Sequence, residues 1–105
     1  MGEEGMSVSL LGKRALITGA GGGMGRSHAV LMAERGADIV IHDINAEGAE
    51  ETAEMVRAHG RNAVVAVADI RDVANFVVAV QKVGPVDILV NNAGVGGARR
   101  TIEDI

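Results

Sequence analysis

The stretch ALITGAGGGMGR, residues 15–26, decides the fold of this chain, because an apolar run passes through a glycine turn into a helical pattern. Glycines in such a turn have separate tasks: one makes the tight turn, one lets the backbone approach an anion, and one packs helix on strand. A helix beginning near Met24 would point unpaired N–H groups and its positive dipole end at that anion. A bare structural turn is the alternative, and the strand–turn–helix context favours a dinucleotide pyrophosphate site.

Strand and helix patterns alternate along the rest of the chain. Strands are predicted over 14–18, 37–43, 63–68 and 86–90, and helices over 24–35, 46–59 and 71–83. Asn45 is placed to cap the second helix, and Gly84-Pro85 ends the third. Short connections between alternating elements predict an α/β domain of parallel βαβ units, with helices on both faces of an apolar sheet.

Composition narrows the class of protein. The chain has 105 residues, 48% of them hydrophobic, which fits one small domain, here expected over 11–105 after a flexible N-terminal tail, 1–10. The net charge of −4 argues against a nucleic-acid partner, and no apolar run is long enough to span a membrane. Because the chain lacks cysteine and its N-terminus lacks the pattern of a secretory signal, we expect a cytoplasmic protein.

Two motifs in the expected order resemble those of the short-chain dehydrogenase/reductase family. Thr18, Gly19, Gly23 and Gly25 match Thr-Gly-x-x-x-Gly-x-Gly, and residues 91–94 match Asn-Asn-Ala-Gly. The resemblance covers nearly the whole chain from about residue 11. It implies a Rossmann-like, doubly wound parallel sheet in the order 3-2-1-4, truncated after its fourth strand.

The resemblance also implies roles for individual residues. The pyrophosphate and nearby ribose would be lined by Gly19, Gly23, Met24 and Gly25. The adenine ring would contact Asp69 and Ile70, and the other ribose would be held by Asn91, Ala93 and Gly94. For the asparagines, a purely structural role is an equally weighted interpretation. No catalytic and no metal-binding residue is assigned; His28, His42 and His59 are interpreted as structural because they lie on different elements.

Asp43, at the end of the second predicted strand, bears on the choice of cofactor. Its carboxylate can accept hydrogen bonds from the adenosine ribose and would repel a 2′-phosphate. Neither Ile44 after it nor Gly22 in the turn supplies the basic group that such families use for NADP. The residues therefore predict NAD in preference to NADP, with a helix-capping role for Asp43 as the alternative.

The catalytic pattern of the family is missing from this sequence. Its Tyr-x-x-x-Lys pair and preceding Ser supply a proton beside the developing alkoxide, whereas this chain has no tyrosine. We therefore expect the cofactor-binding part of an NAD-dependent oxidoreductase that is inactive alone and acts on a small alcohol or carbonyl only when completed. The alternative is a non-catalytic NAD-binding module, or a truncated product, completed by another chain along the open fourth strand. That strand also invites self-association.

Overall fold

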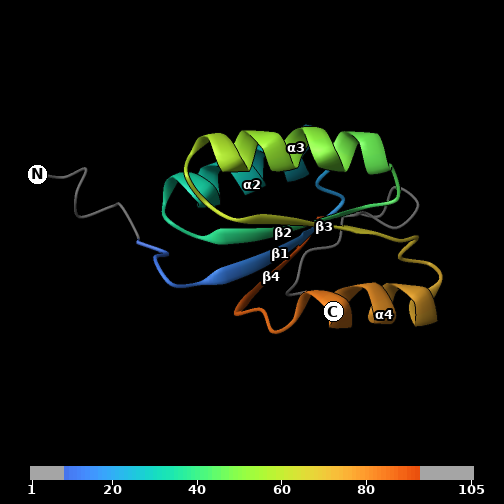
Figure 1. The fold of residues 1–105 in the computed structure, drawn as a ribbon. Coiled ribbons are helices and arrows are strands. Elements are labelled where there is room, and N and C mark those ends of the chain that lie inside the picture. Colours follow the sequence, from blue (N-terminus) through green and yellow to red (C-terminus); the bar gives the residue numbers. More distant parts are fainter. Residues whose placement is uncertain (1–8, 93–105) are drawn as a thin grey trace, which may run out of the picture.

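The computed structural model describes residues 9–92 as a single parallel sheet with helices on both faces (Figure 1). In chain order the elements are β1 (Arg14–Thr18), α2 (Gly23–Glu34), β2 (Asp38–Asp43), α3 (Ala46–Ala58), β3 (Ala63–Val67), α4 (Val73–Val83) and β4 (Ile88–Asn91). The strand order is β3-β2-β1-β4, and every neighbouring pair is parallel. The Rossmann-like order 3-2-1-4 is therefore confirmed.

The two faces of the sheet are covered unequally. Helices α2 and α3 lie together on one face, where they bury Ile17, Ile39 and Ile41 under small alanine side chains (Figure 1). Helix α4 lies alone on the other face, over a smaller cluster formed by Leu16, Val40 and Ala66. None of the residues of α4 is buried. The expected cover on both faces is present, but it is much thinner on the α4 side.

Local hydrogen bonds explain where the observed elements differ from the predicted ranges. Helix α4 begins at Val73, later than predicted, because Oδ1 of Asp72 accepts the Asn75 N–H and caps the helix. Strand β4 begins at Ile88 because Arg14 N–H bonds to the Asp87 side chain in place of a backbone carbonyl. In both places a side chain accepts a hydrogen bond that a backbone carbonyl would otherwise accept. The apolar pattern of the sequence does not indicate this.

Leu10 is part of the packed structure. This residue falls within the predicted tail, yet its N–H donates to the Arg35 carbonyl at 2.7 Å and its side chain packs against the main core. Among residues 9–92, no helix is both long enough and apolar enough to cross a membrane.

Candidate dinucleotide-binding site

The glycine-rich loop leaves the carboxyl end of β1 and enters α2. Gly19 and Gly23 have φ angles of 66° and 55°, a left-handed conformation that side chains with a Cβ rarely adopt. A Cβ added at Gly22 or Gly23 would meet no atom within 4 Å. The outer surface of this loop is therefore open, as a cradle for a ligand must be.

Three consecutive N–H groups of the loop are bound by the last two residues of β2. Gly19 N–H donates to Nδ1 of His42 at 3.3 Å, and Ala20 N–H donates to the His42 carbonyl at 2.8 Å. Gly21 N–H donates to Oδ2 of Asp43 at 2.8 Å. The end of β2 thus holds one side of the loop.

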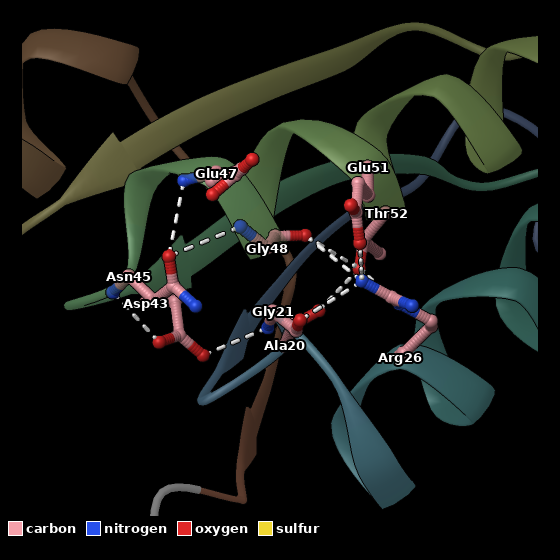
Figure 2. Close-up of polar contacts among 9 residues, drawn as sticks. All are labelled: Ala20, Gly21, Arg26, Asp43, Asn45, Glu47, Gly48, Glu51 and Thr52. Atoms are coloured by element: carbon pink, nitrogen blue, oxygen red, sulfur yellow. Dashed lines mark hydrogen bonds and ion pairs between the residues drawn. The ribbon is translucent and has the colours of Figure 1, made fainter.

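The carbonyl groups of the same loop are held from the helices (Figure 2). The buried Thr52 hydroxyl of α3 donates to Ala20 O at 2.7 Å, and Nη2 of Arg26 donates to Gly21 O at 2.9 Å. Nε of Arg26 also donates to the Thr52 hydroxyl, at 2.8 Å. Nη2 reaches two further acceptors on α3, Gly48 O at 3.1 Å and Oε1 of Glu51 at 3.0 Å. Arg26 is therefore a structural clamp between the loop, α2 and α3.

The amino terminus of α2 remains available for an anion. Arg26 N–H donates to Gly22 O, the first bond of the helix, so the N–H groups of Gly23, Met24 and Gly25 precede the helical ladder. Gly22 at the N-cap contributes no capping side chain. Unpaired N–H groups at the positive end of a helix dipole bind phosphate well, so this part of the site fits a dinucleotide.

Asp43 lies beside the glycine-rich loop, and the cap of α3 is a different residue. Its two carboxylate oxygens accept the N–H groups of Gly21 and Asn45, the latter at 2.9 Å. The helix is capped by Asn45, whose Oδ1 accepts the N–H groups of Glu47 at 3.1 Å and Gly48 at 3.2 Å (Figure 2). The structure thus confirms Asn45 as the cap and places Asp43 against the loop. Ile44, beside it, is 60% exposed.

Asp69 follows β3 and lies at one end of a groove between β3 and α4. Both Asp69 oxygens accept hydrogen bonds from the Arg71 guanidinium, at 2.8 and 3.0 Å, and Oδ1 also accepts the Arg71 N–H. These bonds lower the pKa of the Asp69 carboxyl to about 2. Asp69 is therefore an anion over the physiological range, and Ile70 stands beside it in the exposed connection.

The end of β4 is tied to the end of β1 by side chains. Oδ1 of Asn91 accepts from the Thr18 hydroxyl at 3.1 Å, and that hydroxyl accepts Asn92 N–H at 2.9 Å. Nδ2 of Asn92 donates to Gly19 O at 3.2 Å. The structural interpretation of both asparagines is thus observed, whereas a contact from Asn91 to a cofactor stays a prediction. Ala93 and Gly94 lie outside the described residues.

Comparison with known proteins agrees with this geometry. The family model described as short chain dehydrogenase matches residues 13–105. The chain belongs to the short-chain dehydrogenase family.

Its relatives are longer oxidoreductases. An uncharacterized oxidoreductase of Thermotoga maritima is 43% identical over 102 residues, which are 92% of this chain and 41% of that protein. The 7alpha-hydroxysteroid dehydrogenase of Escherichia coli K12 is 41% identical over 99 residues, 89% of this chain and 38% of that enzyme. Carveol dehydrogenase from Mycobacterium avium, in complex with NAD, superimposes with a TM-score of 0.72 at 38% identity, covering 91% of this chain and 40% of that chain. This short-chain dehydrogenase chain therefore spans about 40% of the length of the relatives it matches.

Several residues that build the site of this short-chain dehydrogenase chain carry no clear signal in the sequence. Arg26 and Thr52 hold the loop carbonyls, yet their pairing across α2 and α3 has no periodic signal in the sequence. The buried position of His42 supports a structural role, but the sequence pattern does not indicate its bond to Gly19 N–H. The only sequence signal for it is the position directly before Asp43.

Proposed function

We propose that this chain is the cofactor-binding part of an NAD-dependent oxidoreductase that transfers a hydride between an alcohol or carbonyl compound and the nicotinamide. The observation that carries the proposal is the uncapped amino terminus of α2 beside the Asp43 carboxylate. When bound, NAD supplies the site that accepts or donates the hydride. The cytoplasmic location proposed with it is supported by the absence of cysteine from the chain.

The residues present fit each part of the dinucleotide. The N–H groups of Gly23, Met24 and Gly25 would bind the pyrophosphate, and Gly19 shapes the turn beneath it. The Asp43 carboxylate and neighbouring Ile44 would face the adenosine ribose. By the family resemblance, Asp69 and Ile70 would contact the adenine, and Asn91, Ala93 and Gly94 the second ribose.

Asp43 supports a preference for NAD over NADP. A 2′-phosphate about 4 Å from its carboxylate would be opposed by up to ~4 kcal/mol at an effective dielectric of about 20, before screening by salt. Arg26 lies near the same loop, but its guanidinium is bonded to Gly21 O, Gly48 O, Thr52 and Glu51. It is therefore not positioned to offset the charge of a phosphate at that place.

Calorimetric titration of the chain with NADH, in parallel with NADPH, tests the proposal. We expect saturable NADH binding and at least about tenfold weaker binding of NADPH, the ratio that a difference of 1.4 kcal/mol produces. Asp43→Asn keeps an oxygen for Gly21 N–H and should narrow this ratio, whereas Glu47→Gln removes a charge from the exposed start of α3 and should leave it unchanged. Equal binding of both cofactors would overturn the preference, and no binding of either would overturn the cofactor site.

Because tyrosine is missing, we propose that the chain alone does not catalyse hydride transfer. Short-chain dehydrogenases protonate the developing alkoxide from a Tyr-x-x-x-Lys pair, and this sequence contains no tyrosine. Incubation with NADH and a panel of small ketones should show no oxidation above the buffer rate. Oxidation that is proportional to protein and lost in Gly25→Ala would contradict this part of the proposal.

The second candidate function is a non-catalytic NAD-binding module, or a truncated product, completed by another chain along β4. Within the described residues β4 is the last strand of the sheet, and Leu89 on the thinly covered α4 face is 46% exposed. An unpaired strand edge beside exposed apolar side chains favours association. Light scattering should show concentration-dependent association that Leu89→Lys reduces more than Val67→Lys on β3. A monomer at all concentrations would contradict it.

A further inference from the structure

His42 connects parts of the site that are far apart in sequence. Its ring is 2% exposed at the end of β2. Nδ1 lies 3.3 Å from Gly19 N, and Nε2 lies 2.8 Å from Ala68 O at the end of β3. One edge of the ring also meets Phe76 of α4, with the ring centroids 4.9 Å apart and the planes at 88°. One side chain therefore joins the glycine-rich loop to the segment that leads into Asp69.

The two partners of His42 determine where its proton lies. Gly19 N–H can only donate, so Nδ1 must carry a lone pair, and Ala68 O can only accept, so Nε2 must carry the hydrogen. Only the neutral ring protonated at Nε2 satisfies both. A second proton, at Nδ1, would face the Gly19 N–H and break that hydrogen bond.

We infer that His42 is a positioning residue for the dinucleotide site, and that protonation of its ring releases Gly19 and weakens NAD binding. The inference rests on the proposed function for the identity of the ligand. Loss of one hydrogen bond that shapes the loop should lower NAD affinity about fivefold. Because the binding-competent state carries the neutral ring, affinity is complete above the titration of His42 and falls as the pH decreases through it.

The charged groups closest in the chain to the ring and to its partners after β3 and in α4 are all carboxylates. Asp69 follows β3 and is paired with Arg71, Asp72 caps α4, and Asp43 is the next residue of β2.

Nuclear magnetic resonance tests the tautomer without any cofactor. The chain has three histidines, so His28→Gln combined with His59→Gln leaves His42 as the only imidazole. We expect its ring nitrogens to show a single hydrogen, at Nε2, near neutral pH. The Gly19 amide signal should then move with the His42 titration. A hydrogen at Nδ1, or a Gly19 amide that ignores the titration, would overturn the inference.

Titration with oxidised NAD at about pH 8 and about pH 5.5, on either side of the ordinary histidine range, tests the effect on binding. The parent chain and the variant without His28 and His59 should both lose affinity about fivefold in acid. His42→Asn retains an acceptor for Gly19 N–H but does not titrate, so its affinity for NAD should be the same at both pH values. His42→Phe fills the ring position without an acceptor, and its affinity should be low at both values.

The outcomes separate this inference from the proposed function. If His42→Asn shows the same loss in acid as the parent chain, His42 is not the responsible group and the inference fails. If no NAD binds at either pH, the proposed function fails. The tautomer and the Gly19 amide then still decide whether His42 holds the loop.

Discussion

Gly25, in the first turn of α2, lies directly against the carbonyl oxygen of Gly19 at the end of β1. A Cβ on Gly25 would stand 2.2 Å from that oxygen and 2.7 Å from Nδ2 of Asn92. Because the obstructing oxygen belongs to the backbone, it cannot move aside without shifting the start of the loop. Gly25→Ala should therefore lower the free energy of unfolding by at least about 2 kcal/mol, as measured by urea denaturation.

Gly22→Ala provides the matched control within the same loop. Its φ of 176° is ordinary extended backbone, and an added Cβ would meet nothing within 4 Å. We expect a change in stability below about 0.5 kcal/mol, the usual range for uncrowded surface positions. An equal loss in both variants would show that close packing is not the role of Gly25.

We predict that the hydroxyl of Thr52 contributes more to stability than the shape of its side chain does. Thr52→Val keeps the volume but leaves Ala20 O and Nε of Arg26 without this partner in a fully buried position. Unfolding free energy should fall by about 1–3 kcal/mol. Thr52→Ser retains the hydroxyl, so its unfolding free energy should fall clearly less than that of Thr52→Val in the same denaturation experiment. A larger loss for serine would assign the effect to packing.

Asn45 supplies the cap of α3, and its removal should unwind the first turn of that helix. Asn45→Ala leaves the N–H groups of Glu47 and Gly48 without their side-chain acceptor, at a cost of about 1 kcal/mol in thermal or urea unfolding. Asn45→Asp preserves the oxygen and should restore most of the stability. If aspartate behaves like alanine, the capping bonds do not carry the effect.

The ion pair of Asp69 and Arg71 predicts a defined response to acid. The folded pKa of Asp69, about 2, lies below the ordinary value, so its contribution to stability is present above about pH 4 and lost as the pH falls towards 2. Arg71→Gln should raise the Asp69 pKa towards about 3.9, as followed by NMR of the carboxyl carbon. Lys82→Gln also removes one positive charge, but it should leave the pKa of Asp69 unchanged.

Local chemistry explains how much of the site could be predicted from the sequence. Gly19 and Gly23 stand out because their left-handed torsions require glycine, and Asp43 because it ends an apolar run before a helix. The alternation of apolar runs likewise predicts the strands and helices to within about two residues. These features each depend on neighbours in the chain.

The supporting contacts could not be predicted because they join distant positions through the finished fold. Arg26 meets Thr52, and His42 meets both Gly19 and Ala68, only after β1, β2, β3 and α3 have come together. The thin cover on the α4 side, in contrast, agrees with the open fourth strand expected from the sequence, since no residue of α4 is buried and Leu89 is 46% exposed.

The hydrogen bonds that hold residues 19–21 have a consequence for the thermodynamics and kinetics of ligand capture. A loop tied on one side by His42 and Asp43 and on the other by Thr52 and Arg26 has little conformational entropy left to lose when a ligand arrives. Association then need not wait for the loop to order. Backbone amides at 19–21 should exchange slowly with deuterium even without ligand, while those at 23–25 should become protected only in the complex.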